Sequence, residues 1–301
     1  MYQDEKRMLF IINPVAGKQE VKREIANVLE IFTSAGFLVT THVTQRRGDA
    51  TETAKLCGGE YDIIACSGGD GTFNETATGV ISGGHYVPIG YMPSGSYNDF
   101  AIYQQISKSM TKAARNIVKG NRRFVDVIRF ETNGRRRNIF NAADFGAFTW
   151  LAYTTPQESK NTLGAYAYIL EGIRDLNKIK GQHLRIEANG GTYEGTYIFG
   201  IICNATMLAG VLSKKGRLIQ SDDGIMEVGL VHMPANRRDL QETIEALRRE
   251  DLSDPHITFF KTREMKMIPE NSLDMSLDGE KETVQDSAEL ECLHSRIELV
   301  G

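Results

Sequence analysis

Cys66-Ser67-Gly68-Gly69-Asp70-Gly71-Thr72-Phe73-Asn74-Glu75 places three closely spaced glycines and the carboxylate of Asp70 between a buried strand and a helix. The apolar residues 63–66 before it are typical of a strand, and apolar residues recur at helical spacing after it. Because glycine lacks a Cβ atom, Gly68, Gly69 and Gly71 can adopt positive φ and let a phosphate approach main-chain N–H groups. The helix N-terminus adds unpaired donors and partial positive charge, so the segment predicts a phosphate site.

Asp70 makes this prediction more specific. A bare carboxylate about 4 Å from a phosphate charge would be repelled by roughly 4 kcal/mol at an effective dielectric constant near 20. A Mg²⁺ ion, a water bound to one, or a substrate hydroxyl must therefore lie between them. The alternative is that Asp70 only caps the helix that follows it.

Two further strand ends carry similar turns. Residues 8–12 form an apolar strand that runs into Asn13-Pro14, and residues 88–92 run into glycine and hydroxyl residues before another helix, which Asn98 or Asp99 can cap. In an open parallel sheet covered by helices, the carboxyl ends of the strands meet at one crevice, where ligands bind. The three turns are therefore expected to form one site.

The order of the motifs resembles the diacylglycerol kinase catalytic-domain family, which also includes sphingosine kinases and bacterial lipid kinases. The resemblance rests on Ile12-Asn13-Pro14, on Gly68 to Glu75, on Pro93-x-Gly95-Ser96-x-Asn98-Asp99-Phe100-Ala101, on Gly164 to Gly172, on Asp223-Gly224 and on Leu277-Asp278-Gly279-Glu280. It implies ATP and Mg²⁺ as cofactors. On this basis we assign nucleotide binding to Asn13, Gly68, Gly69, Gly71, Thr72, Gly95, Ser96 and Asn98.

The pattern of elements changes near residue 125. Strand and helix signals alternate before it, which is typical of a parallel sheet covered by helices. After it strands dominate, with hairpin signals at Asn133-Gly134 and Asn189-Gly190, and a helix is expected at 163–180 and another at 236–249. We therefore expect an α/β nucleotide-binding domain at 1–125 and an antiparallel β-sandwich domain for the lipid substrate at 126–291. By resemblance, residues 292–301 return to the first domain.

The acidic residues of the second half supply the remaining chemistry. Phosphoryl transfer needs a group that takes the proton of the acceptor hydroxyl, and Glu280 resembles the general base of the family. Asp70 is expected to take part in catalysis with it. Without the other motifs, Glu280 would be interpreted as an exposed turn residue.

Asp222 and Asp223 suggest a metal site, because paired carboxylates near main-chain carbonyls offer the oxygen ligands that Mg²⁺ prefers. In the bacterial kinases that the chain resembles, such a site holds a structural Mg²⁺, and Asp223 with the carbonyl of Ile225 fits that pattern. Gln220 stands where an acid is expected, so either Asp222 substitutes or the site is weakened. Asp126 is a further candidate for the network, and the alternative is a solvated Asp-Gly turn.

Composition limits the classes of protein. The 301 residues include 35 basic and 39 acidic side chains, a net charge of −4 that gives no reason to expect a nucleic-acid partner. No segment approaches the roughly 18 apolar residues of a membrane span, and the N-terminal apolar run ends by Pro14, too soon for a signal peptide. The four cysteines form no C-x-x-C pair. We therefore expect a cytoplasmic protein that meets its lipid at the inner membrane face.

The leading hypothesis is an ATP- and Mg²⁺-dependent lipid kinase that converts diacylglycerol to phosphatidate and contacts the membrane peripherally. One alternative is an NAD kinase-like enzyme that phosphorylates a soluble nucleotide, although Asn74-Glu75 and the segment 98–101 favour the lipid group. The other is a noncatalytic nucleotide- or lipid-binding regulator. The sequence does not establish the acceptor or the oligomeric state, and a homodimer is compatible with it.

Overall fold

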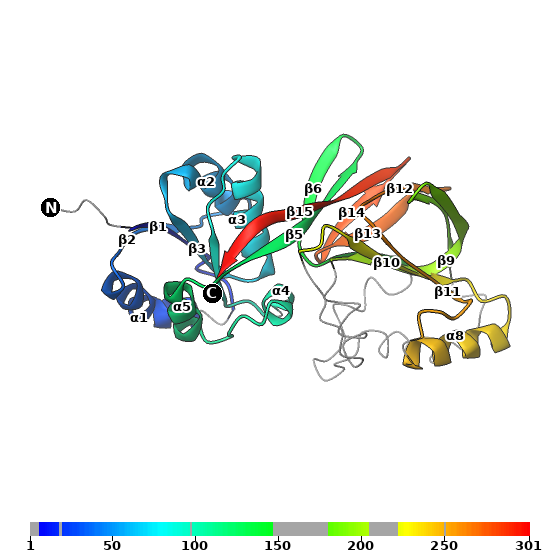
Figure 1. The fold of residues 1–301 in the computed structure, drawn as a ribbon, viewed down its shortest axis with the longest axis horizontal. Coiled ribbons are helices and arrows are strands. Elements are labelled where there is room, and N and C mark those ends of the chain that lie inside the picture. Colours follow the sequence, from blue (N-terminus) through cyan, green and yellow to red (C-terminus); the bar gives the residue numbers. More distant parts are fainter. Residues whose placement is uncertain (1–5, 18–19, 97, 147–179, 205–221, 250) are drawn as a thin grey trace. The chain divides into compact units, whose positions relative to one another are not determined.

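The computed structural model describes residues 6–17, 20–96, 98–146, 180–204, 222–249 and 251–301 (Figure 1). Almost all of the helix predicted at 163–180, together with Gln220, lies outside the described residues. The chain divides into two compact units, Met1–Val125 with Ser295–Gly301 and Asp126–His294.

The first unit is a parallel sheet with helices, as the alternating pattern predicts. Its strands follow the order β4-β3-β1-β2, and the end of β15 lies next to β4. The described elements are β1 (Lys6–Ile12), α1 (Glu20–Ser34), β2 (Phe37–Val43), α2 (Asp49–Cys57), the short 3₁₀ helix Gly58–Glu60, β3 (Ile63–Gly68), α3 (Asp70–Ser82), β4 (Ile89–Pro93), α4 (Asp99–Tyr103) and α5 (Met110–Lys119).

Helices cover both faces of this sheet, which explains why its central strands are continuous apolar runs. Successive side chains of a strand point to opposite faces. Phe10 packs with α1 and α5 on one face, where its ring meets Phe32 edge to face at 5.8 Å. On the other face α3 packs against β3 and α2. All residues of β3 and β4 are buried as a result.

The second unit is built from antiparallel strands, as predicted. Its order is β14-β13-β7-β9-β8-β12-β15, with β10 between β9 and β11, and with β5 beside β15 and β6. The elements are β5 (Arg122–Thr132), β6 (Arg135–Ile139), β7 (Ala142–Gly146), β8 (Gln182–Ala188), β9 (Gly191–Cys203), β10 (Met226–His232), α8 (Arg237–Arg249), β11 (Ile257–Thr262), β12 (Glu264–Pro269), β13 (Leu273–Leu277), β14 (Glu280–Val284) and β15 (Ala288–Val300).

Two-residue turns set the register of these strands. Asn133-Gly134 and Asn189-Gly190, both predicted as hairpin turns, have positive φ at both residues. This conformation matches the right-handed twist of the flanking strands. Asp278-Gly279 forms a third turn of this kind, with φ of 47° and 87°, between β13 and β14. The strand β14 was not predicted, because its sequence Glu280–Val284 is largely polar.

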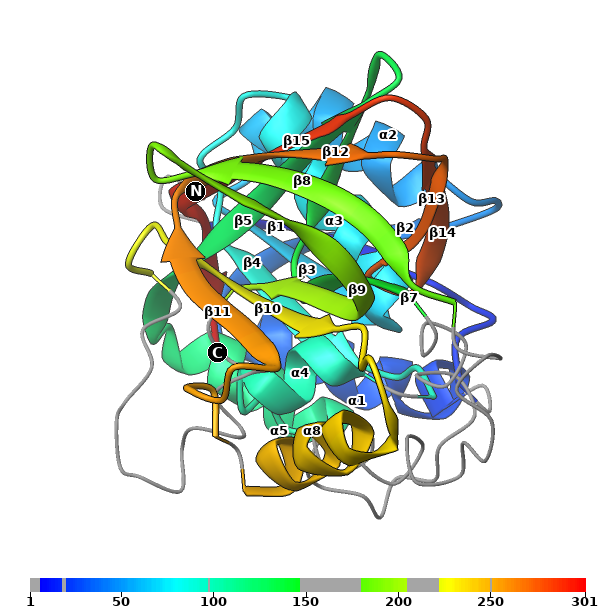
Figure 2. The same ribbon diagram turned by 90° about the vertical axis from the view of Figure 1, so that its right-hand side faces the viewer.

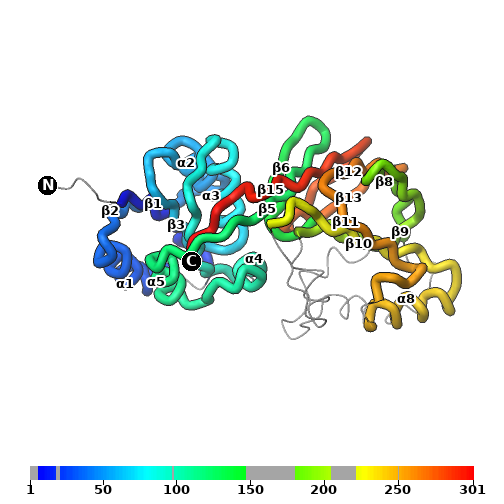
Figure 3. Tube along the Cα trace, in the orientation of Figure 1, coloured from blue at the N-terminus to red at the C-terminus, as the bar shows by residue number. Residues whose placement is uncertain are grey.

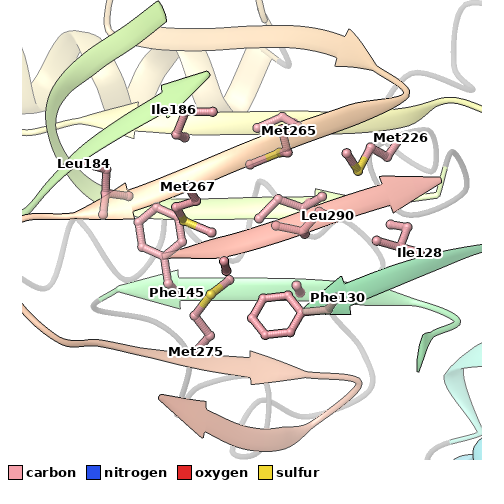
Figure 4. Close-up of a cluster of buried hydrophobic side chains, with 14 of the residues drawn as sticks. Ile128, Phe130, Phe145, Leu184, Ile186, Met226, Met265, Met267, Met275 and Leu290 are labelled. Atoms are coloured by element: carbon pink, nitrogen blue, oxygen red, sulfur yellow. The ribbon is translucent and has the colours of Figure 1, made fainter. Parts of the chain in front are cut away.

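A large apolar core lies among the described strands of the second unit. It draws residues from most of the strands, among them Phe130, Phe145 and Leu290, and several methionines fill the spaces between them (Figure 4). The amphipathic helix α8 covers a second cluster with Leu240, Ile244 and Leu247, and it lies alongside β10 and β11 (Figure 2). Its N-terminus is capped by Asn236, whose side chain accepts the N–H groups of residues 238 and 239.

The strands β5 and β15 belong to both units, and they pair with each other (Figure 3). Residues Ser295–Gly301 at the end of β15 lie in the first unit, where Leu299 is the partner of Ile89 in β4. Val300 is buried in the same core as Phe10. The C-terminal residues therefore complete the N-terminal sheet.

We predict that Phe32→Ala lowers the free energy of unfolding by about 3–5 kcal/mol, because it removes a fully buried ring that contacts Phe10 and Phe37. Guanidinium-induced unfolding measures the change. Phe124→Ala, which truncates a half-exposed ring in the same unit, should change stability by less than about 0.5 kcal/mol. Equal losses in the two variants would contradict the assigned core.

Candidate functional site

Three turns predicted to form the phosphate site meet at one edge of the parallel sheet. Ile12 is the register partner of Ser67, and Gly68 is the partner of Pro93. The hydrogen-bond ladder continues into the turns, since Asn13 N donates to Ser67 O at 2.9 Å and Ser94 N donates to Gly68 O at 2.8 Å. The structure thus brings the three turns together.

The glycines of the first turn do not use the positive φ that the lack of a Cβ atom allows them. Gly68 ends β3, and Gly69 is the extended N-cap residue of α3 with φ of −86°. Instead, the absence of a Cβ atom on these glycines lets neighbouring groups approach the backbone closely. A Cβ on Gly68 would lie 2.3 Å from Thr72 Oγ1, and a Cβ on Gly95 would lie 2.5 Å from Gly69 Cα. Two glycine turns therefore pack backbone against backbone.

Gly71 differs from its neighbours, because nothing in the described structure lies within 4 Å of a Cβ placed there. Gly71 lies in the first turn of α3 with ordinary φ, where alanine would favour the helix by about 1 kcal/mol. The fold therefore does not require a glycine here. The missing side chain leaves open space at the helix N-terminus, as a bound phosphate would need.

Asn13 and Thr72 are held together at this edge. Asn13 Nδ2 donates to Thr72 Oγ1 at 2.9 Å, and Asn13 Oδ1 accepts the N–H of Val15 at 3.1 Å. The loop after β1 also approaches Ser94, because a Cβ on Gly17, which has φ of +54°, would overlap Ser94 O. These contacts fix the side chain of Asn13 beside the first turn of α3.

Asn98 closes the second glycine turn in place of capping α4. Its side-chain amide accepts from Gly95 N at 2.9 Å and donates to Gly95 O at 2.7 Å, while its backbone has φ of 57°. The hydroxyl of Tyr91 also reaches Asn98 Oδ1, at 3.4 Å. Ser96 is exposed beside this loop. Asn98 therefore occupies the N-cap position of α4, but its side chain makes no cap hydrogen bond.

The cap of α4 comes from Asp70 at the start of α3. Its carboxylate accepts the N–H groups of Asp99 at 3.0 Å and Phe100 at 3.2 Å. Burial raises the pKa of Asp70, and these backbone hydrogen bonds oppose the rise. The pKa of Asp99 is also raised, by burial and then by the charge of Asp70. The site thus carries two neighbouring carboxyl groups that a cation would stabilise in their charged form.

An aromatic cluster supports the two turns from within, and the sequence analysis did not identify it. Phe73 stacks on Phe100 with ring centroids 4.0 Å apart, and Tyr91 lies 5.0 Å from Phe73. All three rings are buried. Because Phe73 and Phe100 directly follow the two polar motifs, their spacing could have indicated a shared hydrophobic support.

In the second unit, Asp278 anchors the turn that precedes Glu280. Its carboxylate accepts three backbone N–H groups, those of Phe140 and Asn141 at 2.8 Å and that of Ala142 at 3.1 Å. Its own N–H donates to Ala142 O at 2.9 Å. The turn is therefore bound firmly to the start of β7.

Glu280 is the first residue of β14, opposite Leu277. Its carboxylate forms an ion pair with the guanidinium of Arg137, which also reaches Glu282 Oε2 at 3.5 Å. Both partners of the first pair are partly exposed. Arg137 therefore orients a carboxylate that solvent and a substrate can still reach.

The proposed metal residues Asp222, Asp223 and Ile225 lie on a loop of the second unit. Ile225 N donates to Asp223 Oδ1 at 3.0 Å, and Gly224 N donates to the buried Asp126 Oδ2 at 2.6 Å. His294 Nδ1 lies 3.2 Å from the other Asp126 oxygen. Asp126 thus holds the loop in place.

The donor set fits a hard cation in part. Close to Asp223 lies Glu227, which is 1% exposed, pairs with Lys261 Nζ at 2.6 Å and has a pKa raised by burial. Glu227 Oε2 has no hydrogen-bond partner among the described residues, and a cation would interact favourably with it. Among the described residues, however, Asp222 and Asp223 do not belong to a cluster of three side-chain ligands. A Mg²⁺ held here would need main-chain carbonyls, such as that of Ile225, and water.

Asp144 was missed by the sequence analysis, because an isolated aspartate in a strand carries no motif. It lies opposite Ser276 in the pairing of β7 with β13, close to the Asp278 turn. Burial raises its pKa to about 7, and a hydrogen bond with Ser276 opposes that rise. Near neutral pH this carboxyl group therefore exists in both protonation states.

The comparisons with known proteins agree with this architecture. Residues 7–130 match the model of the diacylglycerol kinase catalytic domain. A diacylglycerol kinase of Bacillus subtilis (strain 168) is 31% identical over 277 residues, which cover 91% of this chain and 90% of that protein. A diacylglycerol kinase of Staphylococcus aureus (strain bovine RF122 / ET3-1) is 29% identical over 277 residues, 91% of this chain and 86% of its own length.

A solved structure shares the fold, an α/β unit followed by an antiparallel one. The crystal structure of a putative diacylglycerol kinase from Bacillus anthracis str. Sterne superposes with a TM-score of 0.77 at 20% identity, and covers 98% of this chain and 96% of its own. The chain belongs to the diacylglycerol kinase family, and it is a kinase of that family. Among the described residues, no helix is long and apolar enough to cross a membrane.

We predict that Gly95→Ala and Gly71→Ala have opposite effects on stability. Gly95→Ala should lower the thermal midpoint, because its Cβ would collide with Gly69 and with Asn98 Oδ1. Gly71→Ala should leave the midpoint unchanged or raise it, since it meets open space in a helix. Differential scanning calorimetry without nucleotide measures both. A midpoint loss of similar size in Gly71→Ala would contradict the open space assigned there.

We predict that Asp144→Asn changes how stability depends on pH. Since the pKa of Asp144 is raised on folding, the unfolded chain loses this proton first, and the free energy of unfolding of the native protein falls between pH 4 and pH 7. The Asp144→Asn variant lacks this decline. Its free energy of unfolding should therefore rise relative to that of the native protein from pH 4 to pH 7, by at most about 4 kcal/mol. Urea unfolding at several pH values measures it.

Asp274→Asn, on the neighbouring strand β13, is the matched control. Hydrogen bonds and the charge of Lys281 lower the pKa of Asp274, so this carboxylate stabilises the fold above that pKa and causes no decline between pH 4 and pH 7. Parallel pH profiles for native protein and Asp144→Asn would show that Asp144 ionises normally in the folded state.

Proposed function

We propose that the protein is an ATP- and Mg²⁺-dependent lipid kinase that transfers the γ-phosphate of ATP to the hydroxyl of diacylglycerol and releases phosphatidate. The observation that carries this proposal is the open space at Gly71 in the first turn of α3, two residues after Gly69, where the two glycine turns pack backbone against backbone. A glycine at that position does not stabilise the fold, but the absence of a side chain leaves room for a phosphate. The similarity to bacterial diacylglycerol kinases supports the choice of acceptor.

In this proposal the nucleotide phosphates bind at the start of α3 and beside the second glycine turn, whose Gly95 N–H is already held by Asn98 Oδ1. The residues are Gly68, Gly69, Gly71, Thr72, Gly95 and Ser96, with Asn13 and Asn98 holding the turns in position. The carboxyl groups of Asp70 and Asp99 would repel the phosphates without a cation nearby, and Mg²⁺ supplies that charge when bound. Asp70 also fixes the relative position of the two turns.

Glu280 takes the proton of the acceptor hydroxyl. A carboxylate serves in this step because it gains a proton late in a loose transition state. Asp278 holds the turn rigid through three N–H groups, and Arg137 aims the carboxylate of Glu280. Asp278 and Arg137 thus position Glu280 without accepting a proton themselves.

A lipid acceptor brings the protein to a membrane surface. We propose that it works in the cytoplasm and binds the inner membrane peripherally. Arg135 and Arg136 at the exposed β5–β6 hairpin contribute to this binding, by about 1 kcal/mol per basic residue near an anionic surface. Arg136 forms an ion pair with Glu131, which reduces the contribution of Arg136 to membrane binding.

We predict that Glu280→Gln abolishes transfer of labelled γ-phosphate to diacylglycerol in mixed micelles, while ATP binding measured by calorimetry survives. The amide keeps the shape of the side chain but cannot accept the proton, a step worth typically 10²–10⁴-fold in rate. Asp286→Asn, an exposed substitution beyond the far end of β14, is the control and should retain activity. Near-normal turnover by Glu280→Gln would reject Glu280 as the base.

We predict that Asp70→Asn removes most activity and weakens ATP binding. One side of the amide is a donor, so it cannot accept both backbone N–H groups that the carboxylate accepts, and the two glycine turns lose their link. Labelled-phosphate assays and nucleotide calorimetry measure the effect. Full activity in this variant would show that neither the link nor the charge of Asp70 matters.

The acceptor is tested by the same assay with diacylglycerol, phosphatidylglycerol, sphingosine, ceramide and NAD offered in turn. Phosphatidate as the main product supports the proposal. Formation of NADP in its place would identify an NAD kinase-like enzyme. Tight ATP binding without transfer to any acceptor would identify a noncatalytic regulator.

A further inference from the structure

A cluster of imidazole and carboxylate groups lies in the second unit, between α8 and the loop that leads to β11. Asp239 and Glu242 are three residues apart on α8, so their side chains share one face of the helix. His256 comes from the loop before Ile257. One ligand atom from each of the three residues lies within 4.8 Å of the other two.

The imidazole of His256 is oriented by a fourth residue. Its Nδ1 lies 2.8 Å from Asp254 Oδ1, and the His256 N–H donates to the same oxygen at 2.9 Å. An ionised carboxylate only accepts hydrogen bonds, so the ring proton lies on Nδ1. The lone pair of Nε2 then faces Glu242. A carboxylate behind the imidazole is the arrangement that fixes metal-binding histidines in proteins.

The distance between the side chains of His256 and Glu242 fits a metal ion bound by both better than a direct hydrogen bond. His256 Nε2 lies 3.9 Å from Glu242 Oε2, which is beyond hydrogen-bond range. Two ligands of one tetrahedral Zn²⁺ lie about 3.3 Å apart, given bond lengths near 2.0–2.1 Å. Because the side chain of Glu242 is partly exposed, a small rotation would close the difference.

Each carboxylate is already positioned by one of its oxygens. Glu242 Oε1 accepts Arg238 Nε at 2.8 Å, and this leaves Oε2 on the side of His256. Asp239 Oδ2 accepts the N–H of Ala235 at 3.2 Å. A metal ion would therefore meet donors whose directions are set by the capped helix.

We propose that Asp239, Glu242 and His256 bind one Zn²⁺ ion, with Asp254 as the outer partner of the histidine and water as the fourth ligand. One imidazole nitrogen and two carboxylate oxygens form a donor set that Zn²⁺ accepts, whereas Mg²⁺ prefers oxygen ligands alone. The ion would tie α8, which covers the apolar cluster with Leu240 and Leu247, to the start of β11. The proposal does not depend on the kinase activity.

The test uses the full chain without a tag, stripped of metal by a chelator and then titrated with Zn²⁺ in calorimetry. We expect one saturable equivalent, and a thermal midpoint that rises with Zn²⁺. His256→Gln and Glu242→Gln should each weaken the binding at least tenfold and abolish the rise. Asp254→Asn, which leaves all three ligands in place, should weaken it by about 10–100-fold.

The matched control is His183→Gln, which removes another surface histidine near a carboxylate, Glu194 Oε1 at 3.6 Å. It should bind Zn²⁺ like the native protein. The proposal is overturned by the absence of a saturable equivalent, by native affinity in both His256→Gln and Glu242→Gln, or by equal losses in the His183→Gln control. Displacement of Zn²⁺ by a tenfold excess of Mg²⁺ would also overturn it. Circular dichroism of each variant without metal establishes that its fold is intact.

Discussion

The hydrogen bonds of Asp70 to the N-terminus of α4 determine the arrangement of the sheet edge to which we assign nucleotide binding. They connect two turns that belong to different strands, and they do so at the point where Gly69 and Gly95 approach each other most closely. A carboxylate accepting N–H groups at a helix start is favourable in itself. Its burial nevertheless carries a cost, which the raised pKa of Asp70 records. The packing of the two turns and the function that we propose thus depend on the same side chain.

The second unit uses the same device at its own key position. Asp278 holds a tight turn by accepting three N–H groups, and Asp126 holds the loop at residue 224 in the same manner. In each case a carboxylate fixes backbone near groups that we assign to chemistry. Since a carboxylate has two oxygens and several lone pairs, one residue can immobilise several residues of a loop.

The fold class could be predicted from the sequence because buried parallel strands and Asn-Gly hairpins leave local signals, such as residues 63–66 and Asn133-Gly134. Within the site, the convergence of three turns followed from the rule for parallel sheets. The capping of α4 by Asp70 could not be predicted, because α4 is about thirty residues away in the chain and only the folded sheet brings the two together. The conformation of Gly68 and Gly69 could not be predicted for a related reason, since glycine permits close approach of backbone segments as well as positive φ.

The return of the chain at its end has a consequence for synthesis on the ribosome. Residues 295–301 supply the strand beside β4, yet they are made only after the whole second unit. While the nascent chain grows, the first unit has its glycine turns but one side of β4 stays without its partner. An unpaired strand edge is prone to non-native pairing. Synthesis of residues 295–301, rather than of the first 125 residues, is therefore the step after which the parallel sheet can be completed.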